Sequence, residues 1–83
     1  MVKKMSKIQI GKTLDAKNLS CPLPILRTKK AIADIQIGEY LEVLATDPGS
    51  VADFKAWTTS TGHELIDNSE EGGIYRFIIK RTK

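Results

Sequence analysis

Pro22 and Pro24, separated by one residue, set the strongest constraint on how this chain folds. Proline disrupts a helix interior, but it is tolerated in the first helical turn, where amide protons have no intrahelical acceptor. Downstream, apolar or small residues recur at helical spacing and form one stripe. The residues of this stripe are Ile25, Thr28, Ile32 and Ile35. The sequence therefore predicts an amphipathic helix over residues 22–36, with Gly38 as its stop signal.

The rest of the chain divides into four strands and a second helix. Alternating apolar residues predict strands over residues 7–14, 40–46, 63–68 and 74–81. Ser50 is the expected N-cap of the second helix, which extends to Thr61 before Gly62. The last two strands are joined by a hairpin loop that contains Gly72 and Gly73.

This order, β-α-β-α-β-β, predicts an α/β protein of the α+β type. Each helical crossover joins parallel strands with a right-handed turn, whereas the final hairpin is antiparallel, so the four-stranded sheet is mixed. With both helices on one face, the result is a two-layer sandwich whose other face meets solvent. Tyr75, Phe77 and Ile79 are expected on one side of the last strand, with Arg76 and Lys80 on the other.

The composition is that of one folded domain. The chain has 83 residues, of which 41% are hydrophobic and 28% charged. We expect residues 1–6 to be flexible and residues 7–83 to form the domain. No apolar run approaches the roughly 18 residues that span a membrane, and no apolar segment follows the basic N-terminus, so a cytoplasmic location is expected. The net charge of +3 is mild beside that of a dedicated nucleic-acid binder.

Cys21 is the only cysteine, so it can form no internal disulfide, and with a single histidine it builds no zinc site. Its place before two prolines predicts that it caps the helix, with the Leu23 amide as the remaining donor to sulfur. The helix dipole, together with Lys17 in the preceding loop, is expected to favour a reactive thiolate. The alternative is a buried, inert cysteine, which the polar neighbours Asn18 and Ser20 disfavour.

Several short segments match a known family. They are Leu14-Asp15, Leu19, Cys21-Pro22-Leu23-Pro24, Asp47-Pro48 and Gly62-His63-Glu64-Leu65. From about Thr13 to Lys80 the chain resembles the TusA/SirA-like sulfur carriers, whose signature is the CPxP motif. The resemblance implies the strand order 1-2-4-3 and a persulfide carried on Cys21. It also implies a carrier-type sulfurtransferase that acts stoichiometrically, without metal or organic cofactor.

The resemblance implies partners as well. The sulfur donor is expected to be a cysteine desulfurase or a rhodanese-type protein, and the acceptor a DsrE-like or other sulfur-relay protein, serving tRNA thiolation, cofactor biosynthesis or sulfur and thiosulfate metabolism. The free protein is expected to be a monomer. Pro22, Leu23, Pro24, Asp15 and Lys17 are expected to support Cys21. Partner docking is assigned to Leu26, Arg27 and Lys30. The family member best known for tRNA thiolation has an acidic residue where this chain has Leu23, which leaves the partner open.

Two other functions stay open from the residues alone. A small RNA-binding α/β module would use a basic face and the open sheet, although Tyr75 and Phe77 are expected inside, so direct nucleic-acid binding is not expected. A redox-sensing thiol would form a sulfenic acid, but the chain has no resolving cysteine. His63 follows the helix-ending Gly62, so a structural contact is the favoured interpretation over a base for Cys21.

Overall fold

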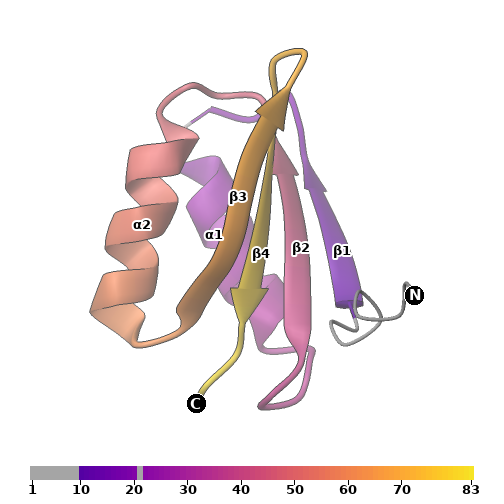
Figure 1. Ribbon diagram of the computed structural model, residues 1–83, viewed down its shortest axis with the longest axis vertical. Coiled ribbons are helices and arrows are strands. Elements are labelled where there is room, and N and C mark those ends of the chain that lie inside the picture. Colours follow the sequence, from indigo (N-terminus) through magenta and orange to yellow (C-terminus); the bar gives the residue numbers. More distant parts are fainter. Residues whose placement is uncertain (1–9, 21) are drawn as a thin grey trace, which may run out of the picture.

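The computed structural model describes residues 10–20 and 22–83, which form a four-stranded sheet with two helices on one face (Figure 1). In chain order the elements are β1 (Ile10–Ala16), α1 (Leu23–Ile32), β2 (Tyr40–Ala45), α2 (Ser50–Thr61), β3 (Glu64–Glu71) and β4 (Ile74–Lys80). The expected flexible segment 1–6, the start of the first predicted strand and Cys21 lie outside the described residues.

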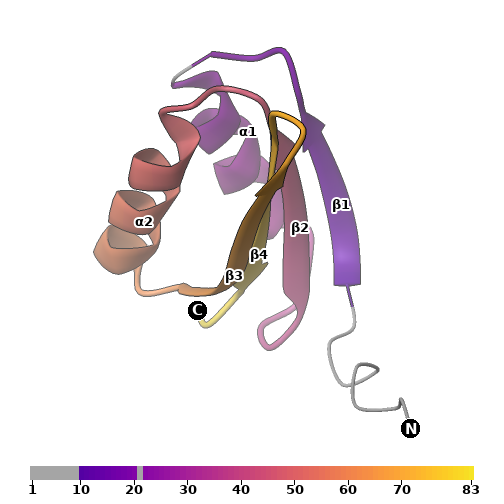
Figure 2. The same cartoon turned by 45° about the horizontal axis from the view of Figure 1, so that its top comes forward.

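The sheet has the strand order β1-β2-β4-β3. β1 and β2 are parallel, whereas β4 is antiparallel to both of its neighbours. Both helices lie against the same face and leave the other face uncovered (Figure 2). The predicted fold class, element order and strand order are therefore confirmed.

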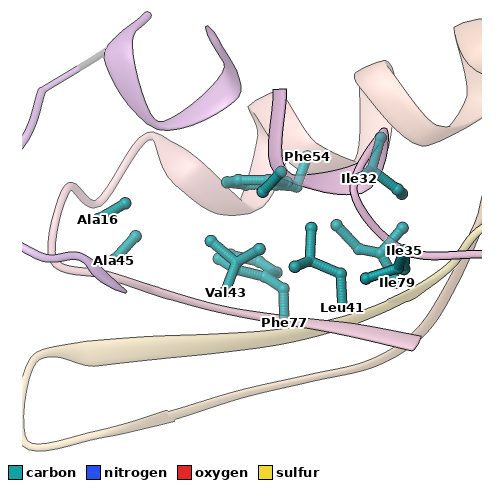
Figure 3. Close-up of a cluster of buried hydrophobic side chains, with 10 residues drawn as sticks. Ala16, Ile32, Ile35, Leu41, Val43, Ala45, Phe54, Phe77 and Ile79 are labelled. Atoms are coloured by element: carbon teal, nitrogen blue, oxygen red, sulfur yellow. The ribbon is translucent and has the colours of Figure 1, made fainter. Parts of the chain in front are cut away.

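The core lies between the helices and the sheet (Figure 3). Phe54 of α2 and Phe77 of β4 are both fully buried, and their rings stack with centroids 4.5 Å apart. Strand alternation brings Leu41, Val43 and Ala45 of β2 to this face, each with no exposed surface. Stacked aromatic pairs stabilise a core by about 0.5–1.5 kcal/mol beyond the contribution of the area that they bury.

The predicted end of α1 is wrong, because the helix ends at Ile32 rather than near residue 36. Beyond it, the Asp34 amide bonds to the carbonyl oxygen three residues back, at 3.0 Å, so the chain tightens into turns. Arg81, 46 positions later, donates from Nη1 to the Ile35 carbonyl oxygen at 2.5 Å. A distant side chain thus binds a backbone carbonyl group just beyond the end of the helix. Gly38 lies further on, with φ +95°, in the turn before β2.

The start of α2 also differs from the prediction. Gly49 is the N-cap, with φ −74°, and Ser50 is the first helical residue. The carboxylate of Asp47 accepts the Gly49 amide at 3.1 Å, so an upstream side chain orders this turn in place of Ser50. Ser50 is buried, and its Oγ has no hydrogen-bond partner among the described residues. At the other end, Gly62 adopts φ +88° and closes the helix as predicted.

The β3–β4 hairpin has a shorter loop than the sequence suggests. β3 continues to Glu71, which pairs with Ile74, so only Gly72 and Gly73 form the turn. Both glycines have positive φ, +60° and +86°, as expected for a two-residue turn of type I′.

Candidate functional site

The candidate site lies at the end of the molecule where both helices begin. Because β1 and β2 are parallel, their carboxyl ends meet at the same edge, and each is followed by a helix that starts there (Figures 1 and 2). The loops after the two strands are joined, since the Asn18 amide donates to Thr46 Oγ1 at 2.9 Å. Asn18 has φ +68°, which lets the loop turn toward α1. This loop leads directly into the Cys21-Pro22-Leu23-Pro24 segment.

Backbone hydrogen bonds tie the start of α1 to the residues before it. The Leu23 amide donates to the Ser20 carbonyl oxygen at 2.9 Å, and the Leu26 amide donates to Pro22 at 3.1 Å. The Leu23 amide thus has a backbone acceptor, while its predicted donation to the sulfur of Cys21 lies outside the described residues. The N-cap is Pro22 rather than the predicted Cys21, and no side chain among residues 10–20 and 22–83 caps the helix. Because the helix begins at Leu23, the positive end of the α1 dipole lies two residues after Cys21 in the chain.

The outer surface at the start of α1 is apolar. Leu23 is 43% exposed and Leu26 is 51% exposed, and we call these two side chains the α1 apolar patch. Arg27 and Lys30 are also exposed on α1. Pro24, in contrast, is buried, and its carbonyl accepts the Thr28 hydroxyl at 2.7 Å. The expected apolar surface with basic neighbours is present, whereas its use for docking stays a prediction.

Asp15 and Lys17 are brought together by the structure. Asp15 accepts the Lys17 backbone amide at 3.0 Å, and the Lys17 ammonium lies 4.0 Å from its carboxylate. Asp15 thus orders the start of the loop. The Lys17 side chain lies beside Leu44 and Arg76 on the helix-free face, on the other side of the sheet from α1. The role of Lys17 beside Cys21 stays a prediction that these contacts do not support.

His63 lies at the other end of the sheet, between α2 and β3 (Figure 1). Its Nδ1 accepts the Thr82 amide at 3.1 Å, and its ring centroid is 5.6 Å from that of Trp57. Burial lowers the pKa of His63, and the nearby charges of Arg81 and Lys83 lower it further. These contacts support the structural interpretation of His63 over a role as base for Cys21.

Sequence reasoning missed an ion pair on the helix-free face. Glu42 Oε2 accepts a hydrogen bond from Arg76 Nε, and Glu42 Oε1 accepts the Thr13 hydroxyl at 2.9 Å. The hydrogen bond from Arg76 lowers the pKa of Glu42. Alternation alone places both residues on one face, but the pairing depends on the β2–β4 register, which the sequence does not reveal.

The helix-free face has few features of an RNA platform. Phe77 is buried, and Tyr75 packs against the core, as predicted. Tyr40 is the single aromatic residue that alternation places on the open face, counting residues 10–20 and 22–83. A base-stacking platform needs two or three such side chains, so this face does not favour RNA binding.

The described residues offer no cluster of three His, Cys, Asp or Glu side chains that would hold a metal ion. None of the helices formed by residues 10–20 and 22–83 is long and apolar enough to cross a membrane.

Comparison with known proteins places this geometry in a family. The family model described as Sulfurtransferase TusA matches residues 12–81. The chain is 54% identical over 69 residues to the sulfur carrier protein TusA of Allochromatium vinosum, which covers 83% of this chain and 91% of that protein. It is 50% identical over 70 residues to YrkI of Bacillus subtilis, a putative sulfur carrier protein, with 84% and 93% covered.

A solved structure shows the same fold. The SirA-like protein of Desulfitobacterium hafniense superposes with a TM-score of 0.74 at 24% identity, over 87% of this chain and 99% of that one. The identity to curated sulfur carriers and the matched family model, taken together, show that this chain belongs to the TusA family of sulfur carrier proteins.

Proposed function

We propose that the chain accepts sulfane sulfur as a persulfide on Cys21 and passes it to an acceptor protein thiol. The observation that carries the proposal is the α1 N-terminus, which begins two residues after Cys21, next to an exposed apolar surface. Cys21 is the only cysteine in the chain, and it lies inside the range matched by the family model. No other thiol of this chain competes for the sulfur.

The transfer is two thiol-exchange steps without net oxidation. The Cys21 thiolate attacks the outer sulfur of a donor persulfide, so a new S–S bond forms, the donor's S–S bond breaks and the donor leaves as a thiolate. An acceptor thiolate then attacks the outer sulfur of the Cys21 persulfide, and Cys21 leaves as a thiolate. The rates follow the thiolate fraction and the accessibility of the attacked sulfur.

The start of α1 suits both steps. A helix N-terminus carries a partial positive charge that stabilises a thiolate and lowers its pKa. Pro22 and Pro24 fix two backbone φ angles and so limit the conformations open to the chain on the C-terminal side of Cys21. Side-chain caps are absent here, so no described side chain competes for this end of the helix.

Partner docking is assigned to the α1 apolar patch together with Arg27 and Lys30. Exposed leucines beside cations fit an interface with an apolar centre and a charged rim. A cysteine desulfurase or rhodanese-type protein would donate sulfur, and a DsrE-like or other relay protein would accept it. Leu23 replaces the acidic residue expected for the tRNA-thiolation route, so sulfur metabolism, cofactor biosynthesis and tRNA thiolation remain parallel proposals for the pathway.

Intact-mass measurement tests the carrier function. The purified chain is incubated with a cysteine desulfurase and cysteine, and separately with a rhodanese and thiosulfate. A mass increase of one sulfur atom is expected, lost on reduction and absent in Cys21→Ser. An unmodified wild-type chain, under conditions that load another carrier of the family from both donors, would contradict the proposal.

A further inference from the structure

The helix-free face of the sheet has a hollow near the β3–β4 turn. The last paired residues of β2 and β4 are Ala45 and Tyr75, whereas β3 and β4 continue one pair further, to Glu71 and Ile74. The hairpin therefore projects beyond the end of β2, as Figure 1 shows. Lys17, just after β1, lines the opposite side. The result is a partly open depression of about 500 Å³.

The floor of this depression follows from strand register. Leu44, Arg76 and Ser69 are direct neighbours across β2, β4 and β3, and alternation places all three on the helix-free face. Ile74, 39% exposed, forms an apolar wall next to Leu44. Glu71, directly opposite Ile74 in the sheet, stands on the same side as that wall.

Positive and negative side chains lie on different sides of the depression. Arg76 uses Nε for Glu42, and its two terminal nitrogens bind no other described residue. Lys17 adds a second cation toward β1, held loosely by Asp15 at 4.0 Å. Glu71, on the β3 side, forms no ion pair with any residue in the part of the chain that the structure describes. Hydrogen-bond donors therefore gather over β1 and β4, and an acceptor stands over β3.

We propose that this depression binds a small zwitterion with a compact apolar body, of the class of free α-amino acids. The ligand carboxylate accepts hydrogen bonds from Arg76 and Lys17, its ammonium group faces Glu71, and its side chain packs on Leu44 and Ile74. A simple anion is disfavoured by Glu71, and a simple amine by the two cations. Arg76 and Glu71 are diagonal neighbours on adjacent strands, so their long side chains are close enough to contact the same small ligand.

The size of the depression is within the range of small-molecule sites, roughly 300–1,000 Å³. Because it is partly open, a ligand as small as an amino acid leaves much of its surface in water. We therefore expect a weak site, with a dissociation constant on the order of 1 mM. This site lies apart from the start of α1, and its binding needs neither Cys21 nor a persulfide.

Amide NMR titration with L-leucine tests the proposal, with isocaproate and isoamylamine as probes that lack the ammonium or the carboxylate group. Saturable shifts are expected at Leu44, Ser69, Gly72 and Ile74 with leucine. Each truncated probe should bind about tenfold more weakly, since it loses a charge-assisted contact. Shifts that do not saturate, that occur away from these residues, or that are equal for the three probes would overturn the proposal.

A pair of variants isolates the role of the acidic wall. Glu71→Gln should weaken leucine binding to about the level of isocaproate. Glu64→Gln makes the same charge change at the other end of β3 and should leave leucine binding unchanged. Cys21→Ser should also bind leucine normally, which separates this site from sulfur transfer. Equal affinity in Glu71→Gln and the wild-type chain, with both folded, would contradict the assignment.

Discussion

The two helices lie on the same face of the sheet, yet their sequences equip them for different tasks. α2 buries Phe54 against Phe77 and ends at a left-handed glycine, Gly62. α1 has no side-chain cap among the described residues and exposes Leu23 and Leu26 at its start. The large exposed hydrophobic residues of the two helices, within the described ranges, are both on α1. α2 therefore anchors the fold, whereas α1 exposes an apolar surface that begins two residues after Cys21 in the chain.

Among the substitutions considered, Phe54→Ala should lower the free energy of unfolding most, because α2 anchors the core through this residue. Phe54 has no exposed surface and stacks on Phe77 at 4.5 Å, so its removal leaves a cavity in the core. We expect a loss of about 3–5 kcal/mol in the free energy of unfolding, measured by urea denaturation. Lys55→Ala, on the exposed side of the same helix, is the control and should change this free energy by less than about 0.5 kcal/mol. A loss for Phe54→Ala no larger than the control's would refute the assignment.

Gly62→Ala should weaken the end of α2. Gly62 has φ +88°, and an added Cβ would approach the Lys83 side chain to 2.9 Å. A left-handed conformation costs a residue with a Cβ roughly 1–2 kcal/mol, which should appear as lower thermal and urea stability. Gly49→Ala, at the N-cap of the same helix with φ −74°, introduces no such strain and should be nearly neutral. If both substitutions cost the same, the left-handed cap is not the cause.

Acid should loosen the end of the molecule near the α2 C-terminus. Since burial lowers the pKa of His63, the unfolded chain binds the proton more readily than the folded one. The stabilising contribution of His63 is therefore complete above the unfolded pKa of about 6.5 and is lost as the pH falls toward the lower folded value. Protonation also removes Nδ1 as the acceptor for the Thr82 amide.

Urea denaturation at several pH values between about 7.5 and 5.5 measures this effect. His63→Gln should flatten the pH dependence in that range. Asp34 and Glu42 also contribute, because hydrogen bonds from Lys12 and Arg76 lower their pKa values, but their contribution is lost only in stronger acid, below the pKa of an unfolded carboxyl group. If the free energy of unfolding depends on pH with the same slope in His63→Gln as in the wild-type chain, His63 is not the cause of that dependence.

Leu26→Gln should leave stability almost unchanged and weaken partner binding. Leu26 is 51% exposed, so a change of less than about 0.5 kcal/mol in the free energy of unfolding is expected. If the α1 apolar patch contacts the sulfur donor, loading of Cys21 at limiting donor should slow about fivefold or more. Ile37→Gln, 64% exposed in the segment after α1, is the matched control. Equal loading rates in the two variants would remove Leu26 from the docking surface.

Local sequence patterns predicted the fold well, because the start of a helix and the buried side of a strand depend on residues that are close together in the chain. Two prolines placed the start of α1 to within one residue, and alternation identified the buried side of β2. The end of α1 could not be predicted, because Arg81 binds the Ile35 carbonyl from a strand end that is 46 positions away. The same limit applies to the Glu42–Arg76 pair, which depends on strand register.

The site was predicted less completely than the fold. Leu26, which the sequence assigned to partner docking, is exposed on α1, whereas the predicted hydrogen bond from the Leu23 amide to the sulfur involves Cys21, outside the described residues. A sequence shows that Pro24 has no amide to donate, yet not that the Ser20 carbonyl reaches the Leu23 amide. Lys17 lies on the helix-free face. Its separation of four residues from Cys21 along the chain could not predict on which face of the sheet it lies.

The strand order has a consequence for how the protein is made. β4 is the last element in the chain, yet it lies between β2 and β3 and pairs with both. On the ribosome, β1, β2 and both helices emerge first, while one edge of β2 and the whole of β3 still await their shared partner. Until β4 forms, β3 and one edge of β2 have no strand to pair with, and such unpaired strand edges favour aggregation of partly folded chains.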